Sequence, residues 1–138
     1  MADKTLKDVS EIMKDRDICM LTTTTSNGML ASRPMSNNRQ VEYDGDSYFF
    51  TWEGSRMVAD IEMDNGVNLG FQQGYGLFIS ITGTAEVTRS REKMEEHWVE
   101  DLDKWFEEGL DTPGLAMITV AAKQIKYWQG EDEGEIRL

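Results

Sequence analysis

Cysteine and histidine are almost absent from this 138-residue sequence, which contains one residue of each. One cysteine excludes a disulfide framework within the chain, and with one histidine it cannot supply the usual ligands of a zinc cluster. Cys19 lies in the apolar run 18–21, so we interpret it as a small buried hydrophobic residue rather than a catalytic thiol. His97 lies in an acidic stretch, where we expect a solvated helix face and no Ser-His-Asp or Cys-His catalysis. We expect no metal site, and the sequence suits the reducing cytoplasm.

Long apolar runs and positive charge are also scarce. No run approaches the ~20 apolar residues of a membrane span, and the N-terminus has no apolar signal core. The net charge is −12, and residues 92–111 hold nine acidic residues and two lysines. Such a surface repels nucleic acid and anionic membranes, so neither is an expected partner, and solubility is the simplest role of the charge. An anionic ligand would need local arginines and backbone amides.

The chain length fits one domain, 1–138, built mainly from strands. β-branched and aromatic runs separated by turn signals predict strands at 18–25, 29–38, 47–52, 67–72, 77–88, 115–120 and 124–128. Asn27-Gly28 predicts a hairpin turn with positive φ at both residues, and Gly83 predicts a bulge. Because strands do not alternate regularly with helices, we expect a mainly β (α+β) fold. Its core would be an antiparallel barrel of six to seven strands with peripheral helices.

Three helices and a tail complete the expected layout. The first helix lies within 1–16 and carries an apolar stripe, and the second runs from a cap at Ser55 to about residue 63. Ser90 would begin the longest helix, an acidic one over 90–108. Its apolar stripe is formed by Met94, Trp98, Leu102 and Trp105. The tail 130–138 is polar and is expected to be mobile.

Three places in the sequence are candidates for binding a ligand. Ser55-Arg56 begins a helix, where free amides and the helix dipole favour an anion; the alternative is a plain cap with an arginine that reaches Asp60. Arg33 stands on a strand, where it can face a ligand or lie on the surface as an ordinary arginine. Trp128 ends the last strand and can stack on a flat ring or simply close a core.

Several short motifs follow one another along most of the chain, from about residue 18 to 128. They are SRPM at 32–35, FFT at 49–51, GSR at 54–56, IE at 61–62 followed by VNL at 67–69 and Gln72, ITGTAE at 81–86 and YWQG at 127–130. In this order they resemble the FMN-binding split barrels of the pyridoxamine 5′-phosphate oxidase-like family. Residues 98–113 point to its general stress protein 26 branch.

The resemblance implies a split β-barrel that works as a homodimer and holds FMN at the interface. It implies that Ser55 and Arg56 hold the phosphate, that Arg33 approaches the flavin, and that Trp128 comes from the other subunit. The full set of implied flavin-binding residues is Arg33, Met35, Ser36, Phe50, Thr51, Ser55, Arg56, Gln72 and Trp128. FAD and a deazaflavin remain alternatives to FMN, whereas one histidine on a helix disfavours haem.

Two positions depart from the family's pattern. Met57 stands where the family usually has a lysine after Ser-Arg, so a cationic phosphate contact is missing and Met57→Lys is expected to strengthen FMN binding. Asn38 stands where the vitamin oxidase has a lysine, which argues against oxidation of phosphorylated pyridoxamine.

Two functions stay open at this stage. The first is a flavin-dependent oxidoreductase with NAD(P)H as a candidate donor, and the second is a non-catalytic flavin-binding stress protein that stores or senses FMN. No catalytic residue is identified from the sequence.

Overall fold

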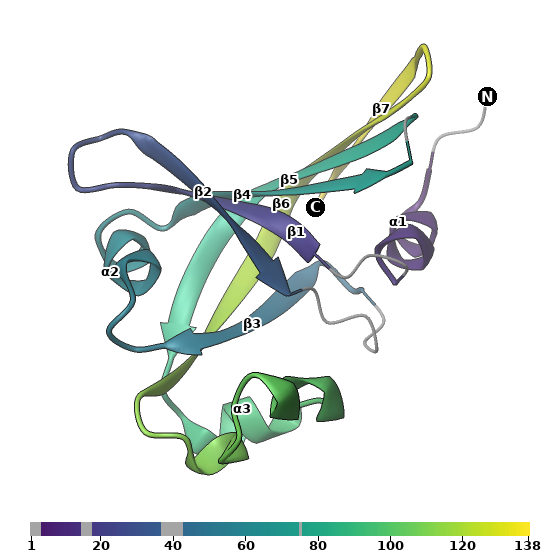
Figure 1. Ribbon diagram of the computed structural model, residues 1–138. Coiled ribbons are helices and arrows are strands. Elements are labelled where there is room, and N and C mark those ends of the chain that lie inside the picture. The colour runs from purple at the N-terminus through teal and green to yellow at the C-terminus, as the bar shows by residue number, and fades with distance from the viewer. Residues whose placement is uncertain (1–3, 15–17, 37–42, 75) are drawn as a thin grey trace.

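The computed structural model describes residues 4–14, 18–36, 43–74 and 76–138. Figure 1 shows a strongly bent sheet with helices at its periphery. In chain order the elements are α1 (Leu6–Met13), β1 (Ile18–Thr24), β2 (Leu30–Ser36), β3 (Asp46–Trp52), α2 (Arg56–Met63), β4 (Gly66–Gln73), β5 (Leu77–Thr88), α3 (Arg91–Glu96), β6 (Leu115–Gln129) and β7 (Asp132–Arg137). Two short 3-10 turns, Glu100–Lys104 and Gly109–Asp111, lie between α3 and β6.

All strand pairs are antiparallel, and the strand order is β2-β1-β4-β5-β6-β3, with β7 also paired to β6. Within the described residues β2 and β3 do not pair, so the sheet stays open between them, as in a split barrel. The predicted α+β fold is confirmed, and the sheet has seven strands within the predicted range, although one of them, β7, was not predicted. No described helix is long and apolar enough to cross a membrane.

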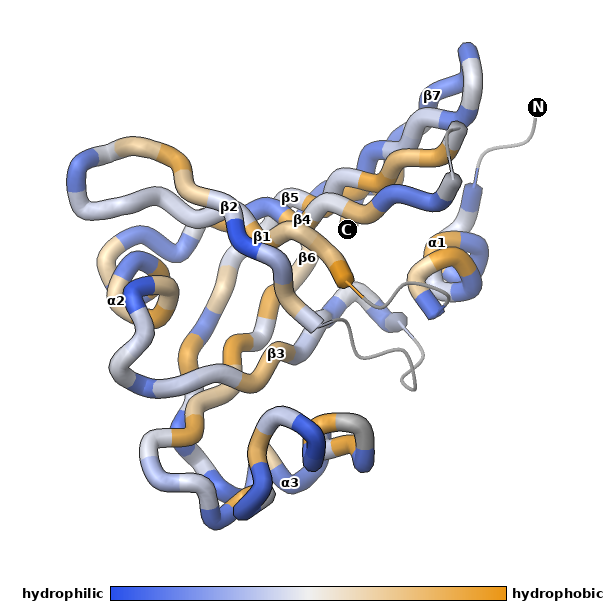
Figure 2. Tube along the Cα trace, in the orientation of Figure 1, coloured by the Kyte–Doolittle hydropathy of each residue, from blue (hydrophilic) through white to orange (hydrophobic). Residues whose placement is uncertain are grey.

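The sheet separates a buried inner face from an outer face. Along β1, for example, Cys19, Leu21 and Thr23 are buried, and the residues between them are more exposed. The inner residues of neighbouring strands join them in the main core, together with apolar residues of α1 and α2. Figure 2 shows that the tip of the β6–β7 hairpin is largely hydrophilic, whereas the acidic segment around α3 mixes hydrophilic and hydrophobic residues.

The β5–β6 ladder contains the bulge predicted at Gly83. Thr82 pairs with Gln124 and Gly83 pairs with Ala122, so Lys123 is an extra residue in β6. A Cβ on Gly83 would overlap the carbonyl oxygen of Ala121, so only glycine fits this close approach of two backbones. The two last strands predicted, 115–120 and 124–128, are therefore one strand, because the bulge absorbs the extra residue without ending the ladder.

The prediction of one long helix over residues 90–108 is wrong. Ser90 caps α3 as expected, but the helix ends at Glu96, and the chain continues through the two short turns. The rings of Trp98 and Phe106 pack against each other with centroids 6.0 Å apart and form a second small core with residues of β3 and β6. A single straight helix would bury Trp105, but in the structure Trp105 is 63% exposed and Phe106 is buried instead. Burial of Phe106 therefore favours a chain that leaves the helix after Glu96.

The tail expected to be mobile is ordered, because β7 pairs with β6 from Asp132 to Arg137. Gly134 lies opposite Tyr127, and a Cβ at Gly134 would overlap the phenol ring of Tyr127. The same phenol oxygen accepts a hydrogen bond from the Lys4 amide at 2.8 Å. The Tyr127 ring therefore lies over Gly134 of the tail and extends to the amide of Lys4.

The remaining local predictions hold in part. Thr5 caps α1 in a capping box with Asp8, inside the predicted range 1–16, of which residues 1–3 and 15–16 lie outside the described residues. The β1–β2 hairpin turns at Gly28 with φ +77°, but Asn27 does not share the positive φ that was expected for both residues.

We expect Gly83→Ala to lower the free energy of unfolding by about 2 kcal/mol or more, because the added methyl group collides with backbone rather than with a flexible side chain. Gly70→Ala is the matched control, since Gly70 is a strand glycine with open space around it, and its effect should stay within about 1 kcal/mol. Urea denaturation of both variants measures the difference. Equal stabilities would show that the bulge tolerates a side chain.

Candidate functional site

The first turn of α2 has the features of an anion site. The Ser55 hydroxyl accepts a hydrogen bond from the Val58 amide at 3.3 Å, which leaves the amides of Arg56 and Met57 without an acceptor in the helix. Arg56 is exposed, and it forms no hydrogen bond or ion pair with any described residue. Its guanidinium stands at the positive end of the helix dipole, an unfavourable place for a cation unless an anion binds there.

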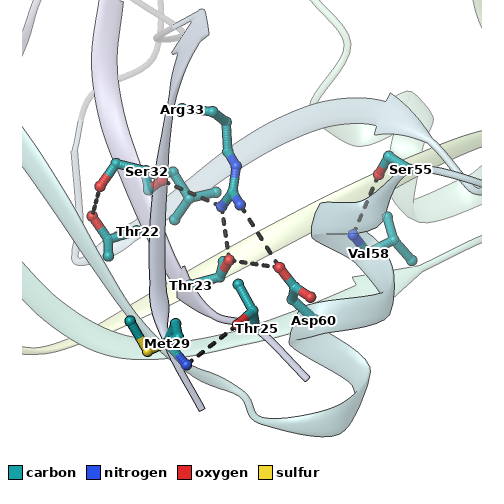
Figure 3. A network of polar contacts seen from close by, with 10 residues as sticks. Thr22, Thr23, Thr25, Met29, Ser32, Arg33, Ser55, Val58 and Asp60 are labelled. Atoms are coloured by element: carbon teal, nitrogen blue, oxygen red, sulfur yellow. Dashed lines mark hydrogen bonds and ion pairs between the residues drawn. The ribbon is translucent and has the colours of Figure 1, made fainter. Parts of the chain in front are cut away.

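The alternative contact, Arg56 with Asp60, does not form, because Asp60 faces the interior and interacts with another arginine. Figure 3 shows the Arg33 guanidinium pointing toward Thr23 and Asp60. Arg33 Nη1 donates to Thr23 Oγ1 at 2.8 Å and to the Leu21 carbonyl at 3.3 Å. Arg33 Nη2 lies 3.8 Å from Asp60 Oδ2. The Arg33 side chain is 24% exposed and stands on the inner side of β2, so it is not an ordinary surface arginine.

Phe50 and Thr51 are neighbours on β3 that face opposite sides. Phe50 belongs to the small aromatic core, where its ring meets Trp98 edge-on with centroids 5.0 Å apart. Thr51 is buried beside it on the side of β3 that faces the main core. With Phe50 covered by Trp98, a ligand at this strand would meet its backbone rather than its ring.

Three of the predicted site residues lie on the outer face of the sheet. Gln72 pairs with Phe78 across β4 and β5, and Phe78 pairs with Trp128 across β5 and β6. Ser36 is exposed on this face at the end of β2, whereas Met35 turns inward against the main core. Trp128 is 36% exposed, and the Lys126 ammonium lies 6.0 Å from its ring centroid. The structure thus places Gln72 and Trp128 on one face, with Phe78 between them, opposite to the face of Arg33.

Met57 overturns one expectation drawn from the family pattern. Its side chain is 6% exposed and packs in the main core, as do Val58 and Ile61 of the same helix. A lysine at this position would start inside the core rather than beside the anion site, so the predicted gain in FMN binding from Met57→Lys is not expected. Asn38, the second departure, lies outside the described residues.

Two further side chains bear on the chemistry. Burial raises the pKa of the Cys19 thiol to about 12, because the low-polarity surroundings disfavour the thiolate; this confirms Cys19 as a structural residue. His97 is not a freely solvated helix residue as predicted, since its ring stacks on Tyr48 with centroids 3.5 Å apart.

The sequence did not predict Thr23 and Asp60 as partners of Arg33. Asp60 is one of four buried positions of α2, and the others are Met57, Val58 and Ile61. A carboxylate among apolar residues at helical spacing is a signal, because a buried charge needs a partner. Thr23 carried no comparable signal in its run of four threonines.

The model of the family described as pyridoxamine 5′-phosphate oxidase like matches residues 4–137. The chain belongs to this family. The chain is 29% identical over 106 residues to Protein bli-3 of Neurospora crassa. The match covers 75% of the chain and 51% of the relative, so the chain spans about half the length of that protein.

Solved structures show the same fold over nearly the whole of this chain. A Clostridium acetobutylicum protein related to general stress protein 26 of Bacillus subtilis superposes with a TM-score of 0.86 at 20% identity, covering 100% of this chain and 97% of that one. The general stress FMN/FAD binding protein of Xanthomonas citri gives a TM-score of 0.73 at 23% identity, covering 89% of each chain. Both carry general stress protein names, which agrees with the predicted branch.

We expect Met57→Lys to destabilise the protein by about 3 kcal/mol, because it places an unpaired ammonium in the main core. Met57→Leu keeps the apolar volume and should cost less than about 1.5 kcal/mol. Thermal denaturation of the two variants, followed by FMN titration, checks this. A folded Met57→Lys protein that binds FMN more tightly would contradict the inward placement.

Proposed function

We propose that this chain binds FMN, with the phosphate held at the first turn of α2. The observation that carries the proposal is Arg56, an arginine without a partner among the described residues, in a chain of net charge −12. The chain has 26 acidic residues that could pair with an arginine, yet Arg56 pairs with none of those described. It stands instead at the end of the helix that favours anions. Family membership adds support, as does the likeness to the general stress FMN/FAD binding protein of Xanthomonas citri.

The same arrangement discriminates among flavins through the phosphate. A terminal phosphate offers a dianion to the two free amides and to Arg56, which favours FMN; FAD, with its bridging phosphates, and a phosphorylated deazaflavin are the alternatives. Bound FMN would supply hydride or electron transfer, and the chain's own residues would hold the phosphate and orient the ring.

We also propose that two copies of the chain share the flavin site. The predicted ligand residues of one chain divide between the α2 side and the outer sheet face, an arrangement that suits a site completed by a second copy. The outer face carries exposed apolar side chains on β1, β5 and β6, with β4 between β1 and β5, namely Ile18, Met20, Phe78 and Trp128. Such a patch suits a protein contact, and Trp128 of a second copy would then cover the flavin ring.

The enzyme proposal is a flavin-dependent oxidoreductase with NAD(P)H as the donor, located in the cytoplasm. The absorption spectrum of the purified protein tests flavin binding, and NAD(P)H oxidation with added FMN tests turnover. A coloured protein that oxidises no NAD(P)H would favour the second candidate, a flavin-binding protein that stores or senses FMN.

We expect Arg56→Ala to weaken FMN by about ten- to hundredfold and to leave riboflavin almost unchanged, because riboflavin lacks the phosphate that the guanidinium would contact. Fluorescence titration of both ligands measures the two dissociation constants. Arg91→Ala is the control, since Arg91 is exposed on α3 and pairs with Asp111. Equal weakening of both ligands would show that Arg56 does not bind the phosphate.

We expect the protein to sediment as a dimer, and Met20→Glu to shift it toward the monomer by placing a charge in the apolar patch. Met63→Glu is the matched control, because Met63 is also exposed but ends α2 away from the outer face. Analytical ultracentrifugation compares the three proteins at one concentration. A wild-type mass of one chain with flavin bound would contradict the shared site.

A further inference from the structure

Asp60 is a buried carboxylate whose role is not explained by packing. Its residue is 5% exposed, and it faces the interior from α2 between apolar neighbours. Burying a carboxylate is costly unless it accepts hydrogen bonds or pairs with a cation. The structure gives it both: the Thr23 hydroxyl lies 3.1 Å away, and Arg33 Nη2 lies 3.8 Å away.

The direction of each hydrogen bond in this group follows from its chemistry. A carboxylate only accepts and a guanidinium only donates, so the hydroxyl between them must donate to Asp60 and accept from Arg33. Both hydrogens of Arg33 Nη1 are thereby committed, one to Thr23 Oγ1 and one to the Leu21 carbonyl. Asp60 thus presents the Thr23 oxygen to Arg33 as an acceptor, and the guanidinium is held in one orientation (Figure 3).

The opposite edge of the guanidinium has a different environment. At 3.8 Å the contact between Nη2 and Asp60 is an ion pair without a hydrogen bond. Neither Nε nor Nη2 donates a hydrogen bond to any described residue. Asp60 therefore offsets the charge of Arg33 but leaves the donors of this edge available.

We infer that Thr23 and Asp60 are positioning residues that hold Arg33 with its Nε and Nη2 donors directed to the phosphate of the flavin, an inference that rests on the proposed function. The two arginines then act differently. Arg56, exposed and unpaired, supplies net positive charge. Arg33, whose charge is matched by Asp60, supplies oriented hydrogen bonds from a largely buried place.

Three variants of the hydroxyl and the carboxylate test the inference in the full chain. Thr23→Val keeps the volume but removes the hydroxyl, and Thr23→Ser restores it; Asp60→Asn removes the charge that orients it. We expect Thr23→Val to weaken FMN about tenfold, the loss of one hydrogen bond to a charged group, and Thr23→Ser to bind like wild type. Asp60→Asn should weaken FMN less than Thr23→Val, because it releases the Thr23 hydroxyl but also unmasks the charge of Arg33. Riboflavin affinity should not change. Glu62→Gln, an exposed acid on the same helix, controls for charge removal.

Salt dependence separates the two arginines. The effect of Thr23→Val should be the same at low and high ionic strength, because the contacts are largely buried, whereas the effect of Arg56→Ala should shrink with salt. Wild-type FMN affinity in Thr23→Val, or equal weakening of FMN and riboflavin, would overturn the positioning role alone.

A second measurement does not need flavin. Nitrogen-15 NMR of the ligand-free protein should resolve separate Nη1 and Nη2 signals for Arg33, assigned by their loss in Arg33→Lys, and Thr23→Val should average them. Averaged signals in the wild type would overturn the inference. If the signals are resolved but the wild type binds no flavin, the proposed function fails, and the role of this group in flavin binding fails with it.

Discussion

The close contact between Gly83 and the backbone of Ala121 is the constraint on which the rest of the sheet depends. It lets β6 continue through an extra residue and change its partner on one side. Before the bulge β6 pairs with β3, and after it with β7, while β5 follows it along both halves. The small aromatic core packs on the first half of β6, and the tail pairs with the second half as β7. Both therefore depend on β6 being one uninterrupted strand.

The same sheet separates the two groups of proposed flavin ligands. The proposed phosphate ligands, Arg56 and Arg33, belong to the side of α2, where Arg56 is exposed and Arg33 contacts Thr23 and Asp60. The proposed ring contact, Trp128, lies on the outer face. An acidic chain can bind an anion in this way because the favourable groups are local, while the excess acid lies on the segment around α3, over a different part of the sheet (Figure 1).

Local chemistry made much of this fold predictable. Strands followed from β-branched alternation, and the helix starts at Ser55 and Ser90 followed from their capping side chains. The failures arose where tertiary contacts override local preference. Burial of Phe106 rather than Trp105 breaks a helix that its own stripe would support, and β7 forms from polar residues because β6 offers a free edge. For the site, family motifs located Arg56, but the inward turn of Met57 and the Thr23–Asp60 pair depend on which side of α2 meets the sheet.

The contact of Tyr127 with Gly134 and the Lys4 amide also constrains how the sequence can change. A larger residue at 134 fits only if the ring at 127 becomes smaller, so these two positions are free to vary only together. Losing the phenol would in turn remove the acceptor of the Lys4 amide. The segment at Lys4 and the strand β7, more than 120 positions apart in sequence, are thus coupled through one aromatic ring, and a change in either segment would alter the packing of the other.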